Sequence, residues 1–542
     1  MGLKTRMAIA ISLLFALLFA FFMAIVAILE FFGYITGILL IIVPIIFTLF
    51  VVFLQWGISP YIIRWIYKIR WGAEYEFGQR NIDFIRSVCA EKNIPTPRIG
   101  IVDDDNPNAF TFGWTRNKAH LVLTRGIFKY CDEEERKAVI AHEVGHISNN
   151  DFVIMTVVGA VPLIFYVIFR GCINILRYSK GGDKGKGQAM AFVAFTALLS
   201  FIVYILSQYI ALLISRYREY YADEFSARNT RNPNALSTAL IKIAYGMATE
   251  GLGMSSEKKH QRHENVFGIF NASSARALTA ISADRNGNYT TETIKKSMAW
   301  DLWNPWAFFM ELGMTHPLPA KRINALCNIS EEMGQAPIIK FDLEKPECYW
   351  DDFLKDIFAK YSFLFAIPIG IVLYLISYNI LYSIGSIISL GALFGFLYLM
   401  FYRYPGNFKN DTVSSLLQDP KASPIKGKAV RLKGKIIGRG NPGLFFSEDL
   451  KLDDGTGLIL LNYHQIARFV DLLIGIFATE KRIGREVEVD GWYRRAVIPY
   501  LDIYKMYENS RTLIRIWTQG LYMTVAFILM IIGFGIIFLS IY

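Results

Sequence analysis

Charged residues are scarce in this sequence, and their scarcity excludes an ordinary soluble globular protein. Only 19% of the 542 residues are Asp, Glu, Lys or Arg, whereas 53% are hydrophobic and 15% aromatic. Soluble chains usually carry about 25% charged residues. We therefore expect an integral membrane protein. The net charge of +11 is explained by basic flanks beside anionic lipid, and it does not by itself indicate nucleic-acid binding.

Cysteine is scarce as well. The five cysteines show no Cys-x-x-Cys spacing, so they favour a reducing cytoplasm over a disulfide scaffold. The sequence also lacks a small-residue cleavage site between its first apolar run and Glu30, which argues against a cleaved signal peptide. Because a second apolar run follows almost at once, we expect an uncleaved helical hairpin that turns at Gly33.

Long apolar runs, by contrast, are plentiful. A helix crosses the hydrocarbon core of a bilayer with about 20 apolar residues. Seven runs meet this criterion: Met7–Leu29, Ile35–Trp56, Phe152–Phe169, Met190–Ile214, Ser362–Leu381, Ile384–Tyr402 and Leu521–Ile541. Basic residues flank the first two runs and place the N-terminus and the following domain in the cytoplasm: Lys4, Arg6, Arg64, Lys68 and Arg70.

One basic loop opposes that orientation. Between the third and fourth runs, the only acidic residue is Asp183, and it accompanies five basic ones: Arg170, Arg177, Lys180, Lys184 and Lys186. A strict positive-inside rule would not place this charge outside the cell. Either the rule is overridden here, or the two segments do not fully cross the membrane.

Histidine is rare too, yet two of the seven histidines stand four residues apart in His142-Glu143-Val144-Gly145-His146. Asp132 and Glu135 form a capping-box pattern that predicts a helix here. On a helix, this spacing puts both imidazoles on one face, where they can bind one metal ion with Glu143 beside a water molecule. The pattern is typical of a zinc hydrolase. The alternative is a solvated helix with two incidental histidines.

A catalytic zinc needs a third protein ligand and an open position. We predict Glu219 as that ligand, because the hairpin of the third and fourth apolar runs returns it to the level of His142 and His146. Asp223 lies one turn further on the same helix face, where it can accept a hydrogen bond from a zinc-bound imidazole. On spacing alone, the alternative is a charged flank beside the membrane.

Four segments together resemble the membrane zinc metalloproteases of the HtpX and CAAX prenyl endopeptidase type. They are Ala141–His146 with Asn150-Asp151, Ser215–Asp223, Pro107-Asn108-Ala109-Phe110, and His316-Pro317 with Arg322. The resemblance runs from about Met7 to about Leu326. It implies one Zn²⁺ per chain held by His142, His146 and Glu219.

The resemblance also implies roles for the other motif residues. Glu143 is expected to be the general base, and His316 the donor that stabilises the oxyanion. Asp223 and Arg322 are expected to support the ligands. Two strands, Ala109–Phe112 and His120–Thr124, follow from the residue pattern, so Asn108, Ala109 and Phe110 are expected to bind substrate by strand addition, with broad specificity. On its own, a histidine before proline such as His316 is also compatible with a surface residue or helix cap.

Two regions depart from the family plan. Residues 251–304 contain a polar stretch that we interpret as a mobile flap or a disordered insertion. His260 and His263 within it are better explained as solvated loop histidines than as a second metal site.

Beyond Tyr404, strands are predicted at Ala429–Ile437, within Leu450–Leu460, and at Glu486–Trp492 and Val497–Ile503. With a helix at His464–Thr479, their order is that of a small OB-like β-barrel. Its basic and aromatic residues can form a nucleic-acid face, but a protein-interaction or regulatory module is favoured: Lys433, Lys435, Arg439, Trp492, Arg494 and Arg495.

The predicted fold is a multi-pass α-helical membrane protein with an α+β gluzincin-like zinc protease core and a C-terminal small β-barrel. The expected domains are a transmembrane hairpin (1–56), the protease core (57–360) with apolar spans at about 152–169 and 190–214, a second hairpin (361–403), the barrel (404–512) and a last transmembrane helix (513–542).

The predicted function is zinc-dependent endoproteolysis in protein quality control. The expected substrates are unfolded or membrane-embedded proteins or peptides, the enzyme lies in the cell membrane with its active site on the cytoplasmic side, and a protein partner can bind the barrel. The alternatives are processing of prenylated C-termini and a catalytically silent membrane scaffold. Nucleic acid is not an expected partner.

Overall fold

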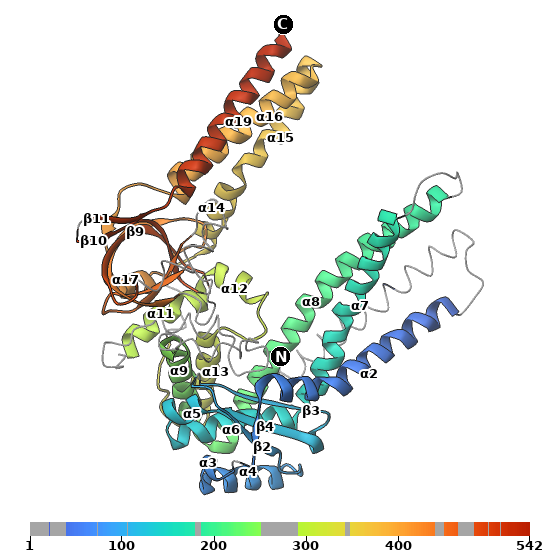
Figure 1. The fold of residues 1–542 in the computed structure, drawn as a ribbon, viewed down its shortest axis with the longest axis vertical. Coiled ribbons are helices and arrows are strands. Elements are labelled where there is room, and N and C mark those ends of the chain that lie inside the picture. Colours follow the sequence, from blue (N-terminus) through green and yellow to red (C-terminus); the bar gives the residue numbers. More distant parts are fainter. Residues whose placement is uncertain are drawn as a thin grey trace.

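The computed structural model describes residue 21 and residues 39–541, apart from 73, 106, 179–185, 251–290, 342–346, 440–448, 464–481, 497 and 510. Figure 1 shows a body of sheet and short helices from which two helical arms extend, with a β-barrel at the base of the second arm. The predicted span Met7–Leu29 lies outside the described residues except for Phe21. The predicted helix His464–Thr479, residues 251–290 of the polar stretch and residues 179–185 of the basic loop also lie outside them.

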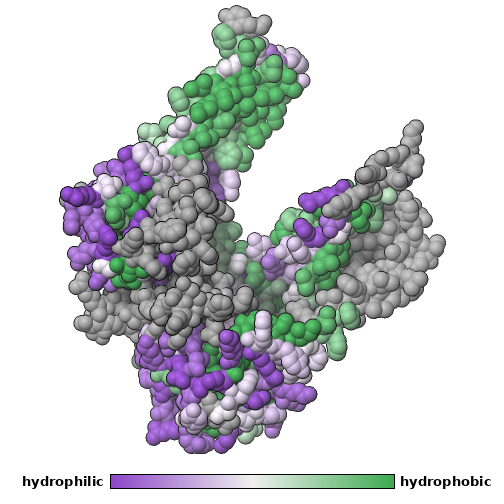
Figure 2. Space-filling view, viewed as in Figure 1, coloured by the Kyte–Doolittle hydropathy of each residue, from purple (hydrophilic) through white to green (hydrophobic). Residues whose placement is uncertain are grey.

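Within the described residues, five helices are long and apolar enough to cross a membrane: Asp151–Arg177, Gly187–Thr230, Trp350–Ser377, Ile380–Arg403 and Thr518–Ile541. They match the last five predicted spans and confirm a multi-pass helical membrane protein. A further helix, α2 (Leu39–Tyr67), covers most of the second predicted span. Figure 2 shows hydrophobic residues gathered on the arm of α15 (Ala366–Ser377), α16 (Ile380–Leu397) and α19 (Thr518–Ile541), while hydrophilic residues dominate the body and the barrel.

The turn of the second hairpin lies four residues earlier than predicted. Helix α15 (Ala366–Ser377) ends before Tyr378, whose φ of 51° is left-handed, and α16 (Ile380–Leu397) begins directly after Asn379. The Asn379 side chain accepts hydrogen bonds from the backbone N–H groups of Leu381 and Tyr382. This polar N-cap starts the new helix inside a continuous apolar run, where hydropathy alone gives no boundary.

A four-stranded sheet forms one layer of the body. Its strands are β1 (Arg70–Trp71), β2 (Arg98–Val102), β3 (Ala109–Gly113) and β4 (Ala119–Thr124), in the order β1-β2-β4-β3. Strand β4 pairs parallel with β2 and antiparallel with β3. The two strands predicted here are confirmed, and β3 lies at the sheet edge.

Helices cover this sheet and build the main core. The body helices are α3 (Glu74–Phe77), α4 (Gln79–Glu91), α5 (Arg125–Tyr130), α6 (Glu133–Ser148), α9 (Pro233–Glu250), α11 (Thr291–Trp303), α12 (Pro305–Glu311) and α13 (Pro319–Glu332). One buried cluster joins residues of β2 and β4 to α4, α6, α9 and α13.

Helices α7 (Asp151–Tyr178) and α8 (Lys186–Thr230) form the first arm, and α8 continues into the body and packs on α6. Helix α14 (Trp350–Tyr361) leads into the second arm, which α19 (Thr518–Ile541) completes.

The C-terminal strands close into a five-strand barrel. The ring order is β6 (Lys428–Arg439), β7 (Leu450–Asp453), β8 (Leu458–Asn462), β10 (Tyr500–Glu508) and β9 (Glu486–Arg494), which pairs back to β6. Only the β8–β10 pair in the ring is parallel. The predicted small barrel is confirmed. Its OB type stays a prediction, which this ring order supports. Sequence reasoning missed the short strands β5 (Lys409–Asn410) and β11 (Arg511–Arg515).

The barrel shares its hydrophobic core with the body. Trp300, Ala307, Met314 and Leu318 belong to the same buried cluster as apolar residues from all five ring strands. The predicted domain limits stay a prediction, and this core crosses the limit placed at residue 404.

Candidate metal centre and active site

Helix α6 carries the first part of the site. The Asp132 side chain accepts a hydrogen bond from the Glu135 backbone N–H (3.0 Å), and the Glu135 side chain accepts one from the Asp132 N–H (2.9 Å). The predicted capping box is therefore confirmed. Residues 138–147 of the helix are all buried, so the two histidines are not incidental residues on a solvated face.

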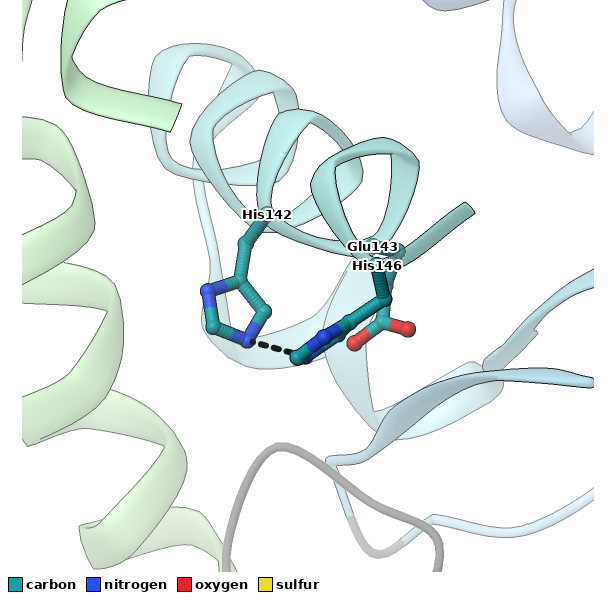
Figure 3. Close-up of side chains that lie close together, drawn as sticks. All are labelled: His142, Glu143 and His146. Carbon is teal, nitrogen blue, oxygen red and sulfur yellow. Dashed lines mark hydrogen bonds between the residues drawn. The ribbon is translucent and has the colours of Figure 1, made fainter. Parts of the chain in front are cut away.

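Three side chains converge beside this helix. The Nε2 atoms of His142 and His146 lie 3.2 Å apart, and Figure 3 shows both rings turned to the same space with the Glu143 carboxylate next to His146. Glu219 reaches in from α8, with Oε2 3.6 Å from His142 Nε2 and Oε1 3.6 Å from His146 Nε2. The α7–α8 hairpin thus brings Glu219 to the histidines, as the sequence predicted.

The outer nitrogen of each histidine faces a carboxylate. His142 Nδ1 lies 2.9 Å from Asp223 Oδ1, and His146 Nδ1 lies 2.6 Å from Asp151 Oδ2. Such contacts fix the ring orientation and leave both Nε2 atoms to point inward. Sequence reasoning identified Asp223 for this position but missed the role of Asp151. The sequence feature that could have indicated this role is the carboxylate of Asp151 directly after Asn150. Asn150 lies between α6 and α7, and its left-handed φ of 55° turns the chain.

Arg322 and His316 close the far side of the site. Arg322 is fully buried and donates two hydrogen bonds to Asp223, from Nε (2.8 Å) and Nη2 (2.6 Å). Its Nη1 lies 3.4 Å from Glu219. His316 Nε2 lies 3.7 Å from the other Glu219 oxygen. The structure therefore gathers all seven residues predicted for catalysis, metal binding and ligand support.

The protein environment shifts the pKa of several of these groups, and those of Glu143 and His142 bear most directly on the chemistry. Burial raises the pKa of the Glu143 carboxyl, and the two neighbouring histidines offset this only in part. Burial lowers the pKa of His142, but hydrogen bonds with Asp223 and Glu219 outweigh it and raise the pKa to about 9. A carboxylate with a raised pKa beside two imidazoles is suited to taking up and releasing a proton.

The edge strand β3 packs against α6, and its Thr111 side chain hydrogen-bonds Glu143. The predicted substrate-binding residues Asn108, Ala109 and Phe110 begin this strand, and all three are buried. The Phe110 ring packs on Tyr67, with ring centroids 4.7 Å apart. The Asn108 backbone N–H and C=O are both bonded to Thr124, so a substrate strand would pair with the backbone of β3 beyond Asn108.

The donor geometry fits a zinc ion. Zn–N and Zn–O bonds of about 2.0–2.2 Å at tetrahedral angles separate the donor atoms by roughly 3.3–3.5 Å. The two Nε2 atoms lie 3.2 Å apart and each lies 3.6 Å from its nearer Glu219 oxygen, values close to that range. The donors are two imidazoles and one carboxylate, a set found in catalytic zinc sites.

Comparison with known proteins decides the family. Residues 79–330 match the model of peptidase family M48. The protease HtpX homologue of Methanothermobacter thermautotrophicus is 36% identical over 244 residues, which cover 44% of this chain and 85% of that protein. The chain belongs to peptidase family M48. The HtpX homologue of Aeropyrum pernix is 27% identical over 286 residues, 52% of this chain and 84% of that protein.

Among solved structures, this M48 peptidase is similar to Ste24p of S. mikatae, with 20% sequence identity and a TM-score of 0.33. The match covers 60% of this chain and 66% of that chain. The family and the His142-Glu143-His146 cluster identify a membrane metalloendopeptidase that hydrolyses peptide bonds. The barrel and the second arm lie outside the M48 match.

Proposed function

We propose that this M48 peptidase is a zinc enzyme that holds one Zn²⁺ per chain on His142, His146 and Glu219. The observation that carries this proposal is the convergence of three buried side chains: the two Nε2 atoms lie 3.2 Å apart, and each lies 3.6 Å from one of the two Glu219 carboxylate oxygens. Carboxylates hold both outer imidazole nitrogens, which supports the same assignment.

The chain's own residues then divide the chemistry. When bound, zinc supplies the Lewis acidity that polarises the scissile carbonyl and acidifies a water molecule. Glu143 removes the proton from the attacking water and delivers it to the leaving amine. The Thr315 hydroxyl lies 2.9 Å from His316 Nδ1 and can donate to it, which leaves the Nε2–H of His316 to stabilise the oxyanion. Arg322 fixes Asp223, which in turn orients His142.

The substrate is proposed to be an extended segment of a protein or peptide that adds to the edge strand β3. Backbone pairing at Ala109 and Phe110, next to Asn108, reads little sequence, so we propose broad specificity for unfolded or membrane-embedded proteins and a role in quality control. The flanking charges described above support an active site on the cytoplasmic side of the cell membrane.

The barrel is proposed to bind a protein partner or to regulate the enzyme, and not to bind nucleic acid. Several of its basic residues are paired with acidic ones. Arg431 donates two hydrogen bonds to Asp490, at 2.6 and 2.9 Å, and Lys433 lies 3.3 Å from Glu488. Charges paired in this way leave little for phosphate groups.

The direct test is cleavage of unfolded casein by the detergent-purified protein, with a prenylated peptide as the competing substrate. We expect casein cleavage that a chelator abolishes and added zinc restores. Cleavage restricted to the prenylated peptide would instead assign the alternative, processing of prenylated C-termini. No zinc-dependent cleavage of either substrate would favour the silent scaffold.

A further inference from the structure

The barrel core reaches the segment that carries His316. Met314 and Leu318 lie two residues before and after His316, and they are 6% and 0% exposed. Both belong to the buried cluster that contains barrel residues such as Val430 and Leu432. The backbone on either side of the oxyanion donor is therefore anchored in the barrel's own core.

Polar contacts fix the preceding helices to the same part of the barrel. The Trp300 indole N–H donates to the Ala422 carbonyl (2.7 Å), and the Asn304 amide donates to the Pro420 carbonyl (2.9 Å). Asn304 also caps α12, because its Oδ1 accepts from the Trp306 N–H. The fully buried Arg495 lies over the Trp300 ring, 5.1 Å from its centroid. Helices α11 and α12 are thus attached to the chain that enters the barrel.

Helix α8, which carries Glu219, holds the same segment from the other side. Arg216, three residues before Glu219, donates to the carbonyls of Glu311 (2.6 Å) and Met314 (3.0 Å). The Glu311 side chain in turn accepts from the Leu318 backbone N–H (3.1 Å). Residues 311–318 are therefore clamped between the helix that supplies Glu219 and the barrel.

We propose that the C-terminal barrel is a positioning element of the active site, and that Trp300 and Asn304 are positioning residues that hold His316 against the metal centre. This inference rests on the proposed function, because it takes His316 as the oxyanion donor. Its consequence is that loosening the barrel contact lowers turnover even of a short peptide, while zinc binding, which uses α6 and α8, is retained. A ligand that shifted the barrel would then regulate the protease.

The test uses the full-length protein and a substitution that breaks only the barrel contact. Asn304→Asp keeps a side-chain oxygen to cap α12 but removes the amide that donates to Pro420. A misplacement of about 1 Å can cost up to about 10²-fold in rate, so we expect kcat for a short peptide to fall roughly tenfold. KM should stay within about twofold, and one zinc should remain bound. Lys433→Ala, at an exposed barrel position, is the matched control with wild-type kcat. Trp300→Phe removes the other hydrogen bond and replaces Asn304→Asp if that variant does not fold.

A double-mutant cycle shows whether these residues act through His316. In a His316→Ala background, Asn304→Asp should lower kcat by less than about twofold, because the group that it positions is gone. An equal loss of kcat in both backgrounds, or a loss of zinc, would overturn the proposal. Glu143→Gln, measured in parallel, tests the endopeptidase assignment separately from the positioning role of the barrel. If it abolishes cleavage while Asn304→Asp and Trp300→Phe keep wild-type kcat, the endopeptidase assignment stands and the positioning role is wrong.

Discussion

Two regions of the molecule bury an arginine completely, and they use it differently. At the metal centre, Arg322 is 0% exposed and gives two hydrogen bonds to Asp223. In the barrel, Arg494 is also 0% exposed, but it joins the Asp502 carboxylate to the backbone carbonyls of Ile425 and Arg403. The first arginine orients a carboxylate that faces a zinc-ligand candidate. The second fastens the chain that enters the barrel.

The difference teaches where a buried charge has chemical consequences. Burying a charge is unfavourable unless it is paired, so both arginines are expected to be essential for stability. Only the partner of Arg322 contacts a residue of the metal centre, because Asp223 holds His142. Substitutions at the two positions should therefore have similar effects on folding and different effects on metal binding.

Arg322→Ala tests the first half of that comparison and has the largest expected effect. It removes the guanidinium group that pairs with the buried Asp223 carboxylate, so we expect a stability loss of about 3–5 kcal/mol. Zinc affinity should weaken by about 10- to 100-fold, because the carboxylate that orients His142 is no longer fixed. Thermal unfolding in detergent and zinc titration with a competing chelator measure the two effects. Wild-type zinc affinity in a folded variant would contradict the proposed chain from Arg322 to His142.

Arg494→Ala tests the second half. We expect a stability loss of about 3 kcal/mol, because Asp502 and two carbonyls lose their donor. Zinc affinity should change less than about threefold, since the described residues that contact Arg494 lie outside the metal centre. The same titration gives the answer, and zinc loss as large as in Arg322→Ala would mean that the two networks are not separate.

A smaller effect concerns pH and lies in the sheet. Burial and, to a lesser extent, the nearby Arg64 guanidinium lower the pKa of His120 to about 4. In the unfolded chain the pKa is about 6.5, so between these values only the unfolded state binds the proton. Stability is therefore full above about pH 6.5 and falls as the pH drops towards 4, by about 2 kcal/mol at pH 5. His120→Phe, measured by thermal unfolding at pH 7.5 and 5, should remove most of this difference. An unchanged difference would assign it to other groups.

The smallest predicted effect concerns the start of helix α6, which carries His142 and His146. Asp132→Ala removes one half of the capping box on α6 and should cost about 1 kcal/mol of stability. Activity at low temperature should stay at the wild-type value, because the site lies ten residues further along the helix. Asp132→Asn is the matched control, since it keeps a capping oxygen. A loss of zinc at low temperature in Asp132→Ala would show that the cap also shapes the site.

The two regions also differ in how far sequence predicts them. His142, Glu143 and His146 lie within about one helical turn, so their spacing alone predicts a shared metal site. Predicting that Glu219 lies beside them required only the assumption that the third and fourth apolar runs form a helical hairpin. The Asp151 contact was missed because it depends on the left-handed turn at Asn150, which breaks the helical periodicity. The contact of Trp300 with Ala422 joins residues 122 positions apart and has no local signal, so the docking of the barrel could not be predicted.

The most direct test of the central claim, that three side chains hold the zinc and a fourth performs the proton transfer, is a paired measurement of zinc content and peptide turnover in Glu143→Gln and Glu219→Ala. Glu143→Gln should keep about one zinc per chain and lose about 10²- to 10⁴-fold in kcat, because it removes the base and no ligand. Glu219→Ala should lose zinc under the same dialysis. Full zinc occupancy in Glu219→Ala, or wild-type turnover in Glu143→Gln, would contradict the account.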